Sequence, residues 1–236
     1  MDAASAWHFC GMALKTRGKV ARRGFFITFE GSEGCGKTTQ LQRLARRLTR
    51  AGSAVLTVRE PGGTALGDRI RHLLKFSRAN HRMSAEAELL LFAASRAQLV
   101  REKILPALAR GRIVLCDRFA DSTRVYQGIG RGLDRSLIRR LNRFVTDGRQ
   151  PDLTFVLDLP ARRGLRRART KTRRPDRMES QRASFYEAVR RGFRALARSE
   201  PRRVRLVDGS GTLHQVSQAI WKHLQPLLRG KGHDPD

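Results

Sequence analysis

Phe25-Phe26-Ile27-Thr28-Phe29-Glu30, followed by Gly31-Ser32-Glu33-Gly34-Cys35-Gly36-Lys37-Thr38, is the stretch of sequence that decides the fold. Its second half fits the pattern G-x-x-x-x-G-K-[ST], in which the backbone N–H groups of a glycine-rich loop surround phosphate groups. The apolar run before it predicts a strand, and Thr39-Gln40-Leu41 after it opens a predicted helix. This succession predicts a phosphate-binding loop for a nucleoside triphosphate, with binding residues Gly31, Ser32, Glu33, Gly34, Cys35, Gly36, Lys37 and Thr38.

Two side chains at the end of this loop have expected chemical roles. The Lys37 ammonium is expected to reach the β- and γ-phosphates of the nucleotide, and the Thr38 hydroxyl is expected to hold Mg²⁺. The alternative is a glycine-rich turn that matches the pattern by accident, but such a turn needs neither the preceding strand nor the following helix. We therefore expect ATP and Mg²⁺ as cofactors.

Length and composition fit one folded domain, which we expect at residues 24–229 of the 236. The basic segment 1–23 lacks the apolar region of a secretory signal, and we expect it and the tail 230–236 to be disordered. No apolar run approaches the roughly 18 residues of a membrane span. The three cysteines show no paired spacing, which argues against a disulfide framework or a zinc site and favours a cytoplasmic setting.

The charge is strongly positive, because 49 Lys and Arg face 21 Asp and Glu, giving a formal net charge of +28. Such a charge attracts nucleic acid through long-range electrostatics. Arginine is nevertheless scattered over every predicted helix, as compositional bias would also produce. We therefore expect no specific nucleic-acid partner and keep a nucleic-acid-dependent ATPase as the alternative function from another class.

Short apolar strands alternate with helices along the chain. Continuous apolar runs predict buried parallel strands at Phe25–Phe29, Ala54–Val58, Ile113–Cys116, Leu153–Leu157 and Val204–Val207. Helices are predicted at Lys37–Arg50, Ala65–Phe76, Ala85–Ala109, Arg135–Val145, Ala161–Arg169, Arg182–Ala197 and Leu213–Leu228. Pro106 is expected to kink or interrupt the third of these helices. The alternation predicts an α/β fold with a five-stranded parallel sheet covered by helices on both faces, and ligands of such sheets bind at the carboxyl ends of the strands.

Three further segments follow predicted strands and therefore reach the same edge of the sheet. The turn Arg59-Glu60-Pro61-Gly62-Gly63-Thr64 brings Arg59 toward the cleft. Asp117-Arg118 is either an ordinary salt bridge or, beside a phosphate-binding loop, a pair whose arginine grips a second phosphate. Residues 162–177 hold nine basic residues in sixteen, which indicates a solvated face, a nucleic-acid patch or a mobile lid over the transferring phosphoryl group, at about 162–178.

The chain resembles the thymidylate kinases, which phosphorylate dTMP to dTDP with ATP. The similarity runs in order from about residue 25 to residue 228 and implies the three-layer fold of P-loop nucleoside monophosphate kinases, with a mobile basic lid. It also implies a homodimer. The matching segments are Phe29-Glu30-Gly31 with Glu33, Arg59-Glu60-Pro61-Gly62-Gly63-Thr64, Leu91-Phe92-Ala93-Ala94-Ser95-Arg96-Ala97-Gln98, Asp117-Arg118-Phe119, Ser122-Thr123, Tyr126-Gln127-Gly128, Pro151-Asp152-Leu153-Thr154 and Asp176-Arg177-Met178-Glu179.

The resemblance also implies individual roles. Phe92 would stack on thymine and Arg96, one helical turn later on the same face, would bond its carbonyl edge, although Phe92 also fits a core position. Glu33 would touch the deoxyribose hydroxyl or organise Mg²⁺ and Arg118. The implied substrate-binding residues are Glu33, Arg59, Phe92, Arg96, Arg118, Ser122, Thr123, Tyr126 and Gln127; the catalytic residues are Lys37, Arg118, Arg169, Arg173 and Arg174; and the metal ligands are Thr38, Asp117 and Glu33.

A phosphate acceptor explains why no catalytic histidine falls within these motifs. The second pKa of a phosphate monoester lies near 6, so the attacking oxygen is ionised at neutral pH without a general base. A kinase of the same fold that acts on another nucleoside monophosphate is the nearest alternative. Arg124 departs from the resemblance, because a smaller or neutral residue is expected there beside the substrate.

Overall fold

The computed structural model describes residues 24–77, 82–170, 177 and 181–229. In these residues five strands form one parallel sheet with the order β2-β3-β1-β4-β5. The strands are β1 (Phe25–Glu30), β2 (Val55–Arg59), β3 (Ile113–Asp117), β4 (Leu153–Asp158) and β5 (Val204–Asp208). Each lies within one residue of its predicted position, and the α/β fold class is confirmed. The prediction that every strand is buried is correct for β1, β3 and β4 but wrong for β2 and β5, which are partly exposed because they form the edges of the sheet.

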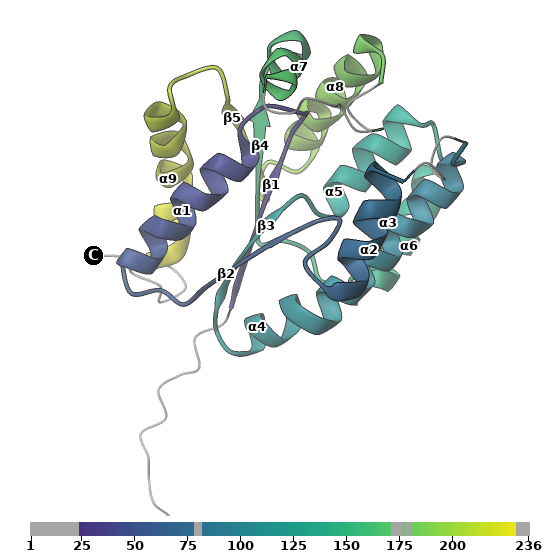
Figure 1. Ribbon diagram of the computed structural model, residues 1–236. Coiled ribbons are helices and arrows are strands. Elements are labelled where there is room, and N and C mark those ends of the chain that lie inside the picture. Colours follow the sequence, from purple (N-terminus) through teal and green to yellow (C-terminus); the bar gives the residue numbers. More distant parts are fainter. Residues whose placement is uncertain (1–23, 78–81, 171–176, 178–180, 230–236) are drawn as a thin grey trace, which may run out of the picture.

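Helices cover both faces of the sheet (Figure 1). They are α1 (Lys37–Arg50), α2 (Ala65–Lys75), α3 (Ala85–Leu99), α4 (Leu105–Ala109), α5 (Ala120–Thr123), α6 (Arg135–Val145), α7 (Ala161–Arg169), α8 (Ala183–Ser199) and α9 (Leu213–Arg229). Helices α1 and α9 pack on one face, and α3, α4 and α8 pack on the other. The result is the predicted three-layer arrangement.

Alternation along β1 supplies both halves of the core. Phe25, Ile27 and Phe29 pack with the apolar side of α1 and α9, whereas Phe26 packs with residues of α3 and α4. All four side chains are essentially inaccessible to solvent, which explains why this strand reads as a continuous apolar run. A buried central strand of this kind fixes the loop that follows it.

The predicted helix Ala85–Ala109 is interrupted. It divides into α3, a π-helical turn at Val100–Ile104 and α4, with Pro106 in the first turn of α4. A proline cannot donate to the preceding turn and its ring clashes with the carbonyl four residues back, so a locally widened turn accommodates it. The expected interruption is confirmed, but it begins six residues before the proline.

The sequence pattern does not predict the helical segment that follows β3. Residues 120–130 form α5 and a π-helical stretch at Arg124–Gly130. The segments 1–23 and 230–236, for which disorder is expected, lie outside the described residues. Within the described part of the chain, no helix has the length and apolar character needed to cross a bilayer.

Candidate functional site

The carboxyl ends of β1, β2 and β3 lie side by side, because Asp117 pairs in register with Phe29 on one side and with Arg59 on the other. A cavity of about 820 Å³ opens at this edge. It is lined by the glycine-rich loop, the start of α1, the Asp117-Arg118 turn, and residues of α3 and of the helical segment 120–130. The segments singled out in the sequence therefore converge on one site.

The glycine-rich loop is shaped by backbone conformations that favour glycine. Gly36 precedes α1 with φ 98°. Gly34 has φ 66°, and a Cβ there would lie 2.0 Å from the carbonyl oxygen of Gly164 in α7. The ammonium of Lys37 lies within the curve of the loop, where it donates to the Gly31 carbonyl at 3.1 Å and the Ser32 carbonyl at 2.8 Å. The loop thus presents a buried cation at the N-terminus of a 14-residue helix.

Thr38 and Asp117 bring two oxygen donors together at the mouth of the loop. The Thr38 hydroxyl donates to Asp117 Oδ2, although the two residues are 79 positions apart in the sequence. A hydroxyl and a carboxylate suit a hard cation such as Mg²⁺. Glu33, the third predicted metal ligand, directs its carboxylate toward Arg118 and Tyr126 instead.

Arg118 is held from several sides beside the loop. Its guanidinium donates to Glu33 Oε1 at 2.6 Å, to the Gly31 carbonyl at 3.1 Å and to Ser122 Oγ at 3.2 Å. It also lies 4.9 Å above the ring centroid of Tyr126. Its backbone has φ 69°, a conformation that non-glycine residues rarely adopt. These contacts fix the direction of the side chain and account for the strained backbone.

Glu33 is ionised in this environment. Burial acts to raise the pKa of its carboxyl, but Arg118, Lys37 and Lys75 outweigh that effect and lower the pKa to about 2. The Tyr126 hydroxyl also donates to Glu33 at 3.4 Å. The negative charge of Glu33 is therefore compatible with phosphate binding by the loop, because Arg118, which directly follows β3, neutralises it.

Phe92 and Arg96 share one face of α3, as predicted, and both line the cavity. Phe92 is only half-buried, which favours a ligand contact over a core position. Arg96 is 1% exposed and already bonds Glu60 at 2.8 Å, Asn142 at 2.6 Å and Thr123 at 2.8 Å. Arg96 also donates a hydrogen bond to the Phe119 carbonyl. It therefore connects several elements around the cavity as well as lining the cavity.

Two partners of Arg96 were not singled out from the sequence. Glu60 belongs to the predicted Arg59–Thr64 turn, and burial, opposed by Arg96, raises the pKa of its carboxyl to about 7. Asn142 comes from α6 and carries no sequence signal, because it is 46 residues away from Arg96. The turn motif could have indicated Glu60 as a candidate, whereas Asn142 needed the structure.

The remaining predicted substrate residues also line the cavity. Ser122 donates to Glu30 at 2.6 Å, and Gln127 donates to Glu88 at 2.7 Å. Arg59 lies at the rim, where it pairs with Asp68 at 3.1 Å and is about half exposed. Glu88 was not predicted; it is 1% exposed and also pairs with Arg131 and Arg177.

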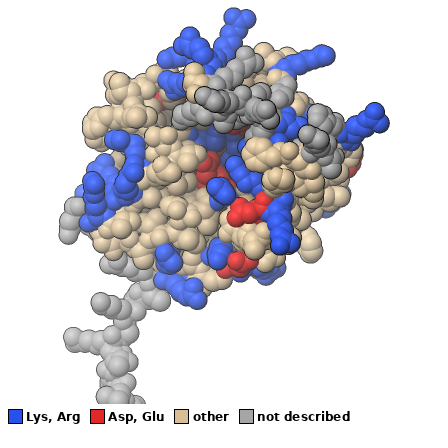
Figure 2. Space-filling model, in the orientation of Figure 1, with Lys and Arg blue, Asp and Glu red and all other residues tan. Residues whose placement is uncertain are grey.

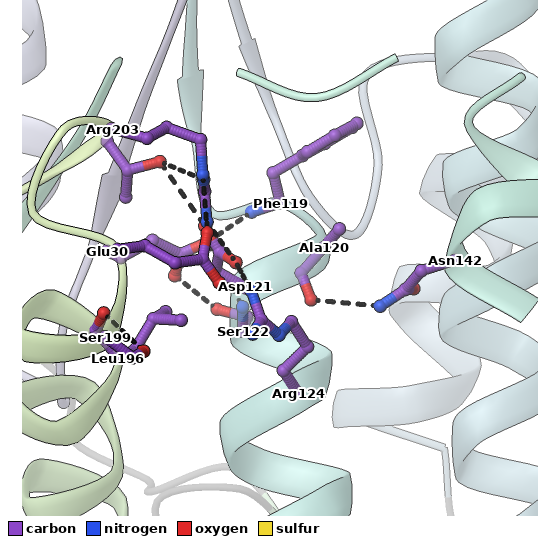
Figure 3. Close-up of polar contacts among 12 residues, drawn as sticks. Glu30, Phe119, Ala120, Asp121, Ser122, Arg124, Asn142, Leu196, Ser199 and Arg203 are labelled. Carbon is purple, nitrogen blue, oxygen red and sulfur yellow. Dashed lines mark hydrogen bonds and ion pairs between the residues drawn. The ribbon is translucent and has the colours of Figure 1, made fainter. Parts of the chain in front are cut away.

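A polar network lies behind α5 (Figure 3), and its members Asp121, Arg124, Glu200 and Arg203 do not line the cavity. Arg203 contacts both oxygens of Asp121, at 2.7 and 3.1 Å, and Glu200 at 2.6 Å. Arg124 bridges the same two carboxylates at 3.1 and 2.7 Å. The departure at Arg124 is thereby explained, because this side chain pairs with acids behind the helix and does not line the cavity.

Glu30 links that network to the site. Its carboxylate accepts hydrogen bonds from the backbone N–H groups of Phe119 and Ser122, at 2.8 and 3.2 Å, as well as from the Ser122 hydroxyl (Figure 3). Burial and the nearby Asp121 raise the pKa of Glu30 to about 7. The segment after Arg118 is therefore anchored at its first turn by a buried carboxyl group.

The predicted lid is described only in part. Helix α7 begins it and packs backbone to backbone against the glycine-rich loop, where Gly164 meets Glu33 and Gly34. Ala168 reaches the cavity wall. Arg173, Arg174 and the side chain of Arg169 lie outside the described residues. Their predicted catalytic role stays a prediction.

Comparison with known proteins agrees with this geometry. Residues 29–220 match the family model described as thymidylate kinase. The thymidylate kinase of Geobacter sulfurreducens is 50% identical over 84% of this chain and 94% of its own length, and that of Syntrophotalea carbinolica is 48% identical over 84% and 93%. A crystal structure of thymidylate kinase from Ehrlichia chaffeensis aligns with a TM-score of 0.69 and 38% identity, over 86% of this chain and 98% of the other. With a phosphate-binding loop, Arg118 and Phe92 around one cavity, the chain belongs to the thymidylate kinase family.

Proposed function

We propose that this protein transfers the γ-phosphoryl group of ATP to dTMP, which gives dTDP and ADP. The observation that carries the proposal is a single cavity in which the glycine-rich loop faces Arg118, Phe92 and Tyr126. One cavity thus offers a triphosphate site and, on another part of its wall, a cation and aromatic rings suited to a second nucleotide.

The donor half of the site is the loop and the start of α1. Backbone N–H groups of the loop and the Lys37 ammonium would hold the β- and γ-phosphates. Lys37 is 7% exposed, so its charge acts in a partly desolvated environment, where electrostatic attraction is stronger than in water. The lid residues Arg169, Arg173 and Arg174 stay predicted partners of the transferring group.

The acceptor half is organised around Arg118, which would hold the dTMP phosphate. Phe92 would stack on the base, with Arg96, Thr123 and Gln127 beside it, and Tyr126 would crowd the 2′ position of the sugar. The acceptor oxygen is already ionised near neutral pH, so no residue needs to remove a proton. The protein's contribution is then to align two mutually repelling anions and neutralise their charge.

The residues at the loop fit a magnesium ion. Thr38 and Asp117 would hold it, because they place a hydroxyl and a carboxylate oxygen side by side, and Glu33 remains a predicted third ligand. A magnesium ion held there would supply positive charge beside the transferring phosphoryl group. No group of three or more acidic, histidine or cysteine ligands occurs in the described part of the chain.

An ADP-release assay with a panel of acceptors tests the proposal. dTMP is expected to support turnover far above dUMP, AMP or no acceptor. Comparable rates with AMP would replace the dTMP assignment with another nucleoside monophosphate. ADP release that is independent of any acceptor but stimulated by nucleic acid would support an ATPase instead.

We also propose that the protein acts as a homodimer in the cytoplasm. Helices α3 and α6 pack together and expose Leu90, Leu137 and Phe144, the last of which is 80% exposed. A second copy of the chain would cover these apolar side chains. The cytoplasmic setting rests on a separate observation, because the buried free thiols of Cys35 and Cys116 suit a reducing compartment. Light scattering is expected to give a dimer for the wild type and a mass near 26.7 kDa for Phe144→Lys. Leu213→Lys, on the distant α9, is the control and should stay dimeric.

A further inference from the structure

A second hollow, separate from the site above, lies between α1 and α9. It has a volume of about 650 Å³, and it is lined from α1 by Arg43, Arg46, Arg47 and Arg50. Helix α9 contributes polar side chains and the ring of Trp221. Lys and Arg side chains gather over these two helices on the face shown in Figure 2. We call this hollow the α1–α9 groove.

The four arginines of the groove have no acidic partner among the described residues. Neither α1 nor α9 contains an Asp or Glu, and none of the ten residues that line the groove is acidic. Arg43 donates to Ser217 Oγ at 3.3 Å, and the Arg47 guanidinium lies 3.6 Å from the Trp221 ring centroid. Apart from the contact of Arg43 with Ser217, these arginines therefore line a groove in which no described residue supplies a counter-charge.

Helix stability alone does not explain this arrangement. Cations near a helix C-terminus interact favourably with the helix dipole, which accounts for Arg47 and Arg50 in the last turn of α1. The effect fades within one turn, so it does not account for Arg43 and Arg46. Elsewhere many arginines of this basic chain are paired, as in the bonds of Arg203 to Asp121 and Glu200.

From these observations we propose that the α1–α9 groove binds a linear polyphosphate, either free or as the phosphate chain of a nucleotide. Arg43 and Arg50 are separated by seven residues of helix, about 10 Å along the axis, which suits a chain of a few phosphates. Guanidinium groups bind phosphate oxygens in pairs of charge-assisted hydrogen bonds. The groove's volume also falls within the range of small-ligand sites.

The geometry favours a compact polyphosphate over a nucleic-acid strand. Strand binding relies on exposed aromatic faces on which bases stack. Trp221 is the aromatic residue of the groove, and it is buried beneath Arg47. The groove is also distinct from the triphosphate site, because Arg43 and Arg50 lie six and thirteen residues beyond Lys37, about 9 and 20 Å along α1.

Trp221 fluorescence provides a local test. The chain has one other tryptophan, Trp7, so the full-length Trp7→Phe protein reports on Trp221 alone. Inorganic tripolyphosphate is expected to draw Arg47 from the ring and change the emission with a saturable midpoint. The change should persist in Lys37→Ala, which weakens the loop site, and parallel titrations with ATP distinguish a nucleotide from a free polyphosphate.

The matched variants remove equal charge at two places. Arg46→Gln/Arg50→Gln lies in the groove. Arg198→Gln/Arg202→Gln lies in the last turn of α8 and in the turn that follows it. All four side chains are exposed, so folding should be retained. The groove pair is expected to weaken tripolyphosphate binding about 10-fold or more, and the control pair to change it less than about twofold. Equal weakening by both pairs, loss of the signal in Lys37→Ala, or tighter binding of a short oligothymidylate would each overturn the proposal.

Discussion

Arg118→Lys tests the proposed acceptor site most directly, because it keeps the charge and removes the planar fork. The arginine makes three hydrogen bonds of 2.6–3.2 Å to Glu33, Gly31 and Ser122. A lysine ammonium is a point charge that cannot keep these contacts and also grip a phosphate through two parallel bonds. Both residues would occupy the φ 69° backbone with similar strain, so the comparison isolates the side chain.

The expected loss follows from the bonds removed. One charge-assisted hydrogen bond contributes about 1.5–3 kcal/mol, which corresponds to a decrease of about 10- to 150-fold in kcat/KM for dTMP. The KM for ATP should change less than about threefold, since the donor half rests on the loop and Lys37. Steady-state kinetics with each substrate varied in turn measures both quantities.

Arg124→Lys is the matched control, because Arg124 pairs with Asp121 and Glu200 behind α5 and does not line the cavity. It should leave kcat/KM for dTMP within about threefold. If Arg118→Lys retained full dTMP efficiency, or lost ATP and dTMP efficiency equally, the assignment of Arg118 to the acceptor phosphate would be wrong.

Three other substitutions probe the base site, the ionised loop acid and the network behind α5. Phe92→Ala should raise the KM for dTMP about 5- to 150-fold, because base–aromatic stacking contributes about 1–3 kcal/mol. Glu33→Gln should lower the free energy of unfolding at pH 7 by at most about 3 kcal/mol, the equivalent of its pKa shift from 4.5 to about 2. Arg203→Met should destabilise the fold by about 3–5 kcal/mol, because it leaves the buried Asp121 without its main partner.

Each of these has an outcome that contradicts it. An unchanged KM for dTMP in Phe92→Ala would make that ring a core residue. The difference in free energy of unfolding between wild type and Glu33→Gln should be largest above pH 4.5 and shrink as the pH falls toward 2, because protonation of Glu33 removes its negative charge. If chemical denaturation gave the same difference at every pH, the ion pair with Arg118 would not contribute. Asp121→Asn should restore part of the stability lost in Arg203→Met, and additive losses would show that the two residues do not interact.

The strands were predictable because their physical cause is local. Every strand of this parallel sheet is a short segment rich in apolar or β-branched residues between turn residues, and β1 is buried on both faces. Residues 120–130 offered no such signal. Their first turn contains Asp121, Ser122 and Thr123, which favour turns and helix ends over helix interiors. The segment becomes helical because distant residues hold its start: Glu30 accepts one hydrogen bond from Phe119, just before it, and two from Ser122, and Arg203 donates two to Asp121.

Site residues that directly follow strands were predictable from the sequence. The partners of site residues that come from distant parts of the chain were not. Helical spacing alone put Phe92 and Arg96 on one face of α3, as found. The same spacing could not show that Arg96 is buried against Glu60 and Asn142, which lie 36 and 46 residues away in the sequence. An arginine on an apolar stripe signals a partner but does not identify it.

Through Glu33, the glycine-rich loop positions Arg118 in addition to binding phosphate. The loop's backbone suits phosphate, and an ionised carboxylate within it opposes phosphate binding unless a cation accompanies it. Arg118 is that cation, and it is held by the Gly31 carbonyl of the same loop, so the loop orients the arginine proposed to bind the second nucleotide. Because these contacts form on folding, the guanidinium is already directed when the acceptor phosphate arrives, and little reorganisation remains for the reaction itself.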